Sequence, residues 1–149
     1  MSTLAETAVR AGLRARVERL RPDSPAKWGR MTAPQMVCHL KDSFRVGMGE
    51  RYASSVSNIL STTLIKWMAL RAPIPWPHGV PTRPEIEQGR GGTPPAEWTS
   101  DCAELVGLMD SFVERTKFGV HPAFGNMSRS EWLIWGYRHV DHHLRQFGV

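Results

Sequence analysis

The sequence predicts an all-α protein, and three observations lead to this fold class. Apolar residues recur at helical spacing in several segments, two capping boxes mark helix starts, and no segment shows the alternation of a strand. With 149 residues, 41% of them hydrophobic and 22% charged, the chain fits one domain, which we place at residues 1–149. We expect an up-and-down four-helix bundle with an extra shorter helix and one long loop rich in proline and glycine.

Three helices are expected in the N-terminal half. Apolar residues at helical spacing from Val9 to Leu20 predict the first, which Pro22 closes. Thr32 and Gln35 form a capping box, which predicts a second helix over about 33–50. The segment 57–71 is more uniformly apolar, so we expect a third helix that is buried on more than one side.

Residues 72–98 carry seven prolines and four glycines, which excludes regular structure there. A loop of this length inside a domain is often functional, and we expect it to cover one end of the bundle. Apolar spacing predicts a fourth helix over about 99–117. A second capping box, Ser128 with Glu131, predicts a last helix that continues to about residue 147.

The charge and cysteine content narrow the classes of partner and compartment. The net charge is +5, but the basic residues are scattered, which favours a solvated basic face over a nucleic-acid footprint. Two cysteines without a paired spacing indicate reduced thiols. The first residues lack a secretory signal, and the most apolar stretch, 59–70, is short and contains Lys66. We expect a cytoplasmic protein that acts on a small molecule, binds neither nucleic acid nor membrane, and has the third helix available for homodimerisation.

Two of the six histidines, His139 and His143, lie one helical turn apart on the apolar face of the last helix. Burying two unpaired imidazoles beside tryptophans costs free energy, because each ring has a donor and an acceptor to satisfy. A shared metal ion would satisfy both rings. Hydrogen-bonded core histidines would also do so, and exposed histidines are the third alternative. The spacing occurs in helical zinc proteases, but the glutamate that follows the first histidine in those enzymes is absent here.

A third ligand has to come from another helix, and outside the last helix His39 is the only histidine on a well-predicted helix. It lies towards the edge of the apolar face of its helix, so spacing alone leaves its role open. The neighbouring Cys38 points about 100° away around the helix and is rejected as a ligand.

Three segments resemble the DinB-like superfamily, and in particular a branch of it whose function is unknown. They are residues 28–40 (WGRMTAPQMVCHL), 121–125 (HPAFG) and 139–148 (HVDHHLRQFG). The resemblance implies a four-helix bundle that binds a divalent transition metal, zinc or nickel in most members, through one histidine of the second helix and the HxxxH pair of the last. Carried onto this sequence, the ligands are His39, His139 and His143.

Two further histidines are candidate catalytic residues. His142, beside a proposed ligand, either acts as a base or faces solvent, and His121, in the loop before the last helix, either enters the site or caps a helix end. The positions of other residues in the sequence predict where their side chains lie. Trp67, Trp132 and Trp135 are expected in the core, Trp76 and His78 at an entrance, Asp141 on the surface, and Arg138 and Arg145 where they would attract an acidic thiol.

Two functions follow from these residues. Three neutral histidines leave a coordination position open on a metal ion, which lowers the pKa of a bound water or thiol and indicates a metal-dependent enzyme. The resemblance implies S-transfer with a low-molecular-weight thiol, or hydrolysis. The alternative is a non-catalytic, metal-stabilised helical module for binding or stress response, which a fourth protein ligand would favour.

Overall fold

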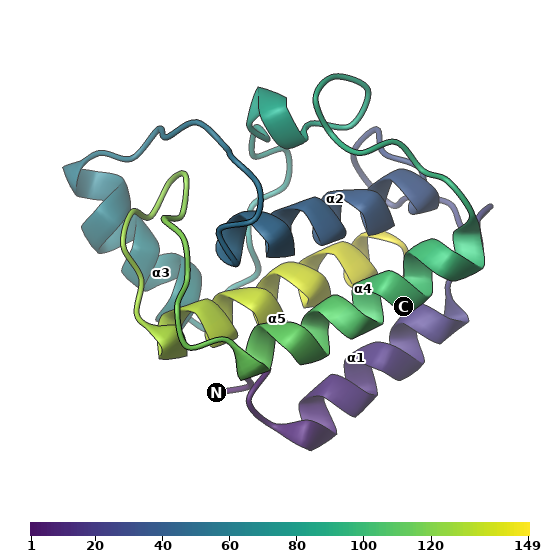
Figure 1. Ribbon diagram of the computed structural model, residues 1–149, viewed down its shortest axis with the longest axis horizontal. Helices are drawn as coiled ribbons and strands as arrows, with labels where there is room; N and C mark the ends of the chain where they lie inside the picture. Colours follow the sequence, from purple (N-terminus) through teal and green to yellow (C-terminus); the bar gives the residue numbers. More distant parts are fainter.

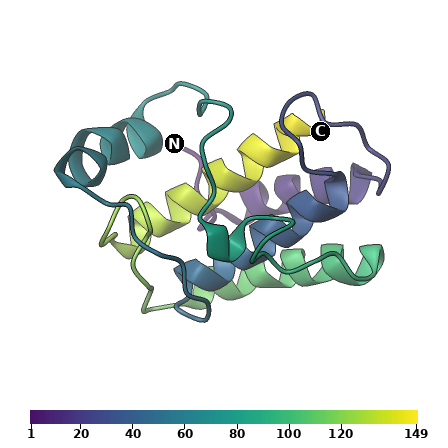
Figure 2. The same cartoon turned by 90° about the horizontal axis from the view of Figure 1, so that it is seen from above.

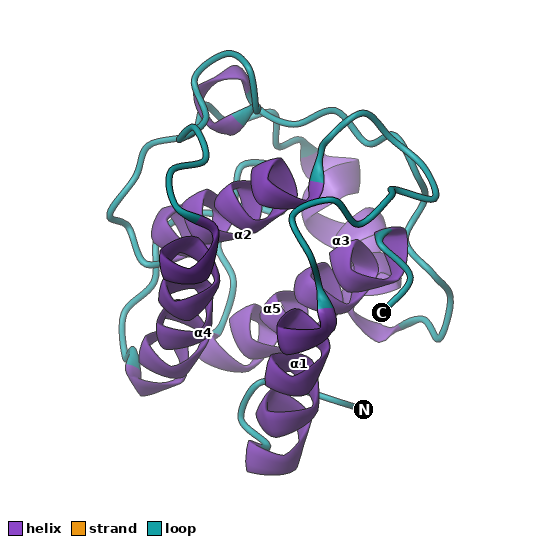
Figure 3. Ribbon diagram, turned by 90° about the vertical axis from the view of Figure 1, so that its right-hand side faces the viewer, coloured by secondary structure: helices purple, strands orange, loops and turns teal.

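The computed structural model describes residues 1–149 and contains helices and loops but no strand (Figure 3). The prediction of an all-α protein is confirmed. A π-helical turn, Ser61–Ile65, runs directly into α3, and a short 3-10 turn, Pro84–Ile86, interrupts the long loop. The five α-helices are α1 Thr7–Arg19, α2 Ala33–Gly47, α3 Lys66–Arg71, α4 Trp98–Glu114 and α5 Arg129–Gln146.

Helix α5 is central and contacts each of the other four helices. Helices α1 and α5 run in one direction, and α2 and α4 run in the opposite direction (Figures 1 and 2). The alternation expected of an up-and-down bundle therefore does not hold between α2 and α4. The segment 48–97 that joins them is long enough to return the chain to the end where α2 began, so the two helices pack side by side and parallel.

Both predicted capping boxes form. The Thr32 hydroxyl accepts a hydrogen bond from the Gln35 N–H at 3.3 Å, and the Gln35 side chain accepts from the Thr32 N–H at 2.9 Å. Ser128 and Glu131 make the equivalent pair at the start of α5. Helix α2 ends earlier than expected, at Gly47, because the chain turns at Gly49, whose φ of 74° is left-handed.

The core lies between α2, α4 and α5, with α1 packed on α4 and α5. Phe44, Phe112, Trp132 and Trp135 form its aromatic centre, with ring centroids 4.9 to 6.3 Å apart. Trp132 and Trp135 therefore lie in the core, as predicted. No helix combines the length and the apolar character that crossing a membrane requires.

The expectation that the third helix is buried is wrong. Ile59 is 85% exposed, Leu64 53% and Trp67 59%, so Trp67 is not a core residue. Within the segment 59–71 only Ser61 and Leu70 are buried: Ser61 donates a hydrogen bond to the carbonyl of Ala123, and the helix that carries Leu70 contacts α5. The apolar composition of a helix shows which side chains could be buried, but their burial depends on which other elements pack against the helix.

The long loop is anchored on Asp42, a fully buried carboxylate of α2. Its Oδ1 accepts hydrogen bonds from Arg51 at 2.9 Å and from the Thr93 hydroxyl at 2.7 Å, and its Oδ2 accepts from the Thr93 N–H at 2.7 Å. Arg51 also donates to the backbone carbonyls of Glu85 and Gly91. These bonds hold the short turn that ends at Ile86 against α2, where the Ile86 side chain is buried.

Candidate metal centre

Three imidazoles meet between α2 and α5. The Nε2 atoms of His39, on α2, and His139, on α5, are 3.2 Å apart. One ring nitrogen from each of His39, His139 and His143 lies within 4.8 Å of the other two, and the ring centroids are 4.9 to 5.2 Å apart. This cluster could hold a metal ion.

The helices explain why the rings converge. His139 and His143 are one turn apart on the face of α5 that contacts α2. His39 was expected towards the edge of its helix, yet it is only 6% exposed. Helix α2 is covered by α4, by α5 and by the turn that contains Ile86, so the edge of its apolar face is also interior.

The spacing of two of the nitrogens fits an ion. Two nitrogens that each lie 2.0–2.1 Å from a tetrahedral zinc ion are about 3.3 Å apart. The 3.2 Å separation of the His39 and His139 Nε2 atoms matches that value. The Nδ1 atom of His39 is buried and makes no hydrogen bond of normal geometry, although the backbone of Ile86 lies near enough to raise the pKa of His39 slightly.

Burial keeps the three rings neutral. It lowers the pKa of His39 to about 4, against a small opposing effect of Asp42. Burial also holds the pKa values of His139 and His143 well below the ordinary value, and the neighbouring histidines lower both further. Neutral imidazole is the form that binds metal, so near pH 7 the cluster presents uncharged ligands.

Gln146 is a contact of the cluster that the sequence analysis did not single out. Its side-chain oxygen lies 2.8 Å from Nδ1 of His143, and its side-chain nitrogen donates to the Trp28 carbonyl at 2.7 Å. Gln146 follows His143 by three residues on a helix, so its proximity could have been inferred from spacing. The approach of Trp28, 118 residues earlier in the chain, could not.

An aromatic rim adjoins the cluster. The ring of Trp28 stacks on His78 at 3.9 Å, and the ring of Trp76 is 5.8 Å from His139 and 6.0 Å from His142. His142 does not join the three histidines but lies among these rim residues, and burial lowers its pKa. A cavity of about 250 Å³ beside it is lined by Trp76, Arg138 and His142, among other residues. The structure thus places Trp76 and His78 next to His142, where an entrance was expected.

His121 lies outside the cluster. Its Nδ1 atom accepts hydrogen bonds from the N–H groups of Ala123 and Phe124, at 3.2 and 3.0 Å, and its ring stacks on Phe124. Burial lowers its pKa to about 3. Of the two alternatives for this residue, the structure shows a cap, but of a turn rather than of a helix end.

The charged residues of α5 make contacts that the sequence did not predict. Arg138 donates to the carbonyls of Ala72 and Ile74 and so holds the start of the long loop. Asp141 was expected on the surface, but it is partly buried between Arg16, at 2.6 Å, and Arg145, at 2.9 Å. Its helix face is not free, because α1 packs against it.

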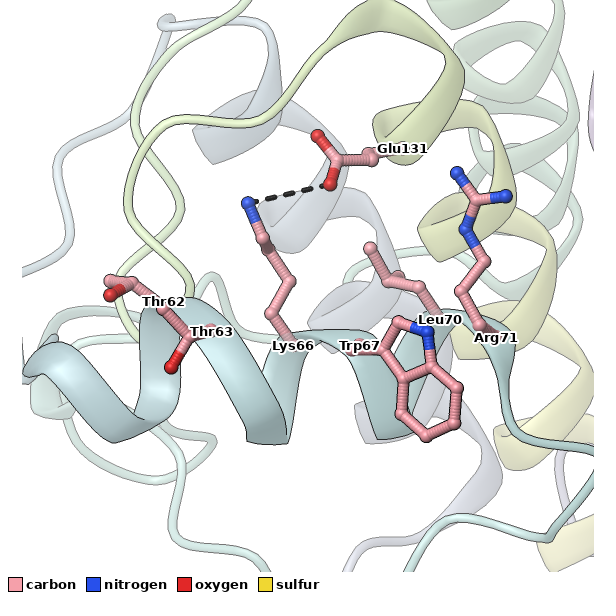
Figure 4. Close-up of a pocket in the computed structure, with 7 residues that line it drawn as sticks. All are labelled: Thr62, Thr63, Lys66, Trp67, Leu70, Arg71 and Glu131. Atoms are coloured by element: carbon pink, nitrogen blue, oxygen red, sulfur yellow. Dashed lines mark ion pairs between the residues drawn. The ribbon is translucent and has the colours of Figure 1, made fainter.

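A second cavity, of about 390 Å³, lies beside α3 and includes none of the histidines (Figure 4). The ion pair between Lys66 and Glu131, at 3.3 Å, connects α3 to the start of α5 here. Trp67 and Arg71 line it from α3. This cavity is therefore separate from the candidate metal centre.

The fold and the site together define an all-helical protein with a buried cluster of three histidines that could bind a metal ion. The chain belongs to the family described as "Protein of unknown function (DUF1569)", whose sequence profile matches residues 5–148. No curated protein and no solved structure matches it significantly.

Proposed function

We propose that the chain is a metal-dependent enzyme in which His39, His139 and His143 hold one divalent transition metal ion, zinc or nickel. One observation carries the proposal: three neutral imidazoles from two helices, two of them buried and that of His139 partly buried, place one ring nitrogen each within 4.8 Å of the other two. When bound, the ion would act as a Lewis acid that lowers the pKa of a coordinated water or thiol.

The number of ligands favours catalysis over a purely structural site. Structural zinc sites use four protein ligands, whereas catalytic sites use three and leave a position for water or substrate. No carboxylate or thiol joins the three histidines. Asp42, one turn from His39, is occupied by Arg51 and Thr93, and Cys38 lies beside Asp101 with its thiol pKa raised to about 11.

The residues around the cluster fit a small substrate. The cavity of about 250 Å³ beside His142 reaches Trp76, whose ring is also close to His139. The neutral ring of His142 can accept a proton from a substrate in this cavity. The stacked Trp28 and His78 cover the neighbouring rim and limit the access of water.

The reaction classes that suit this arrangement are S-transfer with a low-molecular-weight thiol and hydrolysis, both in keeping with the resemblance to the DinB-like superfamily. That resemblance also supports a four-helix bundle. We further propose a single domain over residues 1–149 from the length and composition of the chain, and a cytoplasmic location from its two unpaired cysteines. Of the two arginines expected to attract an acidic thiol, Arg138 is engaged with the loop backbone. Arg145 pairs with Asp141 at 2.9 Å, but its side chain is 62% exposed and lines the cavity beside His142.

The alternative is a metal-stabilised module without catalysis. It uses the same ligands, so activity separates the two proposals. A panel of bacterial thiols with a reactive electrophile tests S-transfer, and a panel of ester and amide substrates tests hydrolysis. Turnover that needs the metal supports the enzyme, and inactivity of the metal-loaded protein across both panels supports the module.

A homodimer through the exposed segment 59–68 is the proposed assembly. At roughly 180 Å² for a fully exposed large side chain, its six exposed apolar residues present on the order of 600 Å². A standard interface buries about 800 Å² per partner. No charged residue occurs between Tyr52 and Ile65, and Lys66 is paired with Glu131, so the face suits a protein partner. The six residues are Ile59, Leu60, Leu64, Ile65, Trp67 and Met68.

Elemental analysis of the purified, untagged protein tests the metal site. The wild type should contain about one zinc or nickel ion per chain, and His143→Ala should lose most of it while retaining its helical circular dichroism. His78→Ala is the matched control, because His78 lies on the rim outside the cluster, and it should keep the ion. A wild type without metal, or an unchanged content in His143→Ala, would refute the assignment.

A further inference from the structure

We propose that Gln146 is a positioning residue that, together with the backbone carbonyl of Trp28, fixes the proton of His143 on Nδ1 and so presents the Nε2 lone pair to the cluster. The inference rests on the proposed metal site. It concerns the tautomer and orientation of one ligand and adds no new ligand.

The contacts form a short chain of hydrogen bonds. Gln146 is 3% exposed and His143 is 8% exposed, so neither side chain has ready access to water as an alternative partner. The side-chain oxygen of Gln146 is 2.8 Å from Nδ1 of His143. Its side-chain nitrogen is 2.7 Å from the carbonyl oxygen of Trp28.

The Trp28 carbonyl determines which atom donates and which accepts in both hydrogen bonds of the Gln146 side chain. A carbonyl oxygen can only accept, so the amide NH₂ of Gln146 must face Trp28 and the amide oxygen must face His143. That oxygen also can only accept, so Nδ1 of His143 must carry a hydrogen. A neutral imidazole has one N–H, and Nε2 is therefore left with the lone pair that a metal needs.

The backbone at residues 27–29 leaves space for the side-chain amide of Gln146. Gly29, directly after Trp28, has a φ of 80°, and a Cβ atom there would lie 2.6 Å from the side-chain nitrogen of Gln146. The N–H of Lys27 donates to the backbone carbonyl of Gln146 at 2.7 Å. Residues 27–29 thus close around the end of α5, and the Trp28 ring continues to the rim by stacking on His78.

A hydrogen bond of this kind has two effects on a ligand. It holds the ring in the orientation for binding, and it makes the ligating nitrogen more basic. Loss of such a partner typically weakens metal binding by about 10-fold to 100-fold. We expect a loss of this size at Gln146.

Two substitutions separate positioning of His143 from anchoring of the loop. Gln146→Met removes both hydrogen bonds, whereas Gln146→Glu removes the N–H donor to Trp28 but keeps an oxygen that accepts from His143. Affinity for Zn²⁺ is measured by competition with a chromophoric chelator, and ligand geometry by the visible absorption of the Co²⁺-loaded protein. Gln146→Met should bind Zn²⁺ about 10-fold to 100-fold more weakly and change the Co²⁺ spectrum. Gln146→Glu should bind within about threefold of the wild type.

Equal losses of affinity in the two variants would mean that Gln146 acts only through the loop, and would overturn the inference, as would an unchanged affinity in Gln146→Met. The metal-free wild type supplies a measurement that needs neither variant. Long-range ¹H–¹⁵N NMR should show His143 as the Nδ1–H tautomer, and an Nε2–H tautomer would refute the inference. A wild type with the expected tautomer that binds no Zn²⁺ would instead refute the proposed metal site.

Discussion

Two regions of this molecule reverse the usual distribution of polar and apolar residues. On α2 and at the end of α5, polar side chains are buried, and Asp42, His39, His143 and Gln146 are all 8% exposed or less. Along residues 59–68 large apolar side chains face outward, with Ile59 85% exposed. Buried polar groups need partners and broad apolar surface needs cover, so each region indicates something different about what the protein binds.

The two regions differ in how much of this bonding and this cover the chain itself provides. In the buried region the carboxylate of Asp42 and the amide of Gln146 are bonded by the protein, and the imidazoles of His39, His139 and His143 lie together. These three rings could hold a single metal ion. On the segment 59–68 the chain buries only Ser61 and leaves six large apolar side chains at least 40% exposed, so what lacks cover there is an extended surface.

A large effect on stability should come from the buried polar region. Asp42→Ala should lower the free energy of unfolding by about 3 kcal/mol, because it leaves Arg51 and the Thr93 N–H without their acceptor. Urea denaturation of the metal-free protein measures this. Asp110→Ala is the matched control, since Asp110 pairs with Arg14 on the surface and should cost less than about 1 kcal/mol. Equal costs would show that the loop anchor contributes no more than a surface ion pair.

A smaller effect, dependent on pH, is expected at His121. Its pKa is about 3 in the folded protein, against an ordinary value of 6.5, so between these values the unfolded chain takes up a proton that the folded protein does not. Stability from this group is complete above pH 6.5 and falls as the pH drops, by up to about 1.4 kcal/mol per pH unit. The side chain is only partly buried, so a loss of about 1 to 2 kcal/mol is expected between pH 7 and pH 5.

His121→Asn should remove that part of the loss, because asparagine can still accept from the N–H groups of Ala123 and Phe124 but takes up no proton. Urea unfolding of the metal-free protein at pH 7 and pH 5 gives the difference. The exposed His78, replaced by asparagine, should leave the pH dependence as in the wild type. The same acid sensitivity in His121→Asn and the wild type would count against a buried, neutral His121.

Local features of the structure were predictable from sequence, and those that depend on packing were less so. The starts of α2 and α5 follow from capping boxes, in which every atom lies within four consecutive residues. The pairing of His139 with His143 follows from helical spacing alone. The inclusion of His39 does not, because it depends on how α2 lies against α5; elimination among the histidines made it the candidate, and the family resemblance supported it.

One wrong prediction, the burial of α3, and one missed contact, between Gln146 and Trp28, have the same origin. The burial of α3 was inferred from its composition, which carries no information about whether another element covers it. The contact between Gln146 and Trp28 joins residues 118 positions apart, through a turn that depends on the left-handed Gly29. Neither packing nor long-range backbone contacts can be read from the spacing of residues in one segment.

The smallest effect on folding and the clearest effect on assembly should come from the segment 59–68. Ile59→Glu and Leu64→Glu should each change the free energy of unfolding of the monomer by no more than about 0.5 kcal/mol, because the replaced side chains have few contacts to lose. If two copies pair through this segment, each buried glutamate would have to lose its hydration at the interface. Sedimentation velocity should therefore show a wild-type dimer and monomeric variants.

Val120→Glu provides the matched control, since Val120 is 57% exposed but lies outside the segment, and it should remain dimeric. Leu70→Ala tests the opposite side of the same helix. Leu70 is buried against α5, so its truncation should cost about 2 to 5 kcal/mol without breaking a dimer formed on the outer face. A wild type that sediments as a monomer at tens of micromolar would show that the apolar segment does not mediate self-association. Only the buried histidines would then indicate what the protein binds.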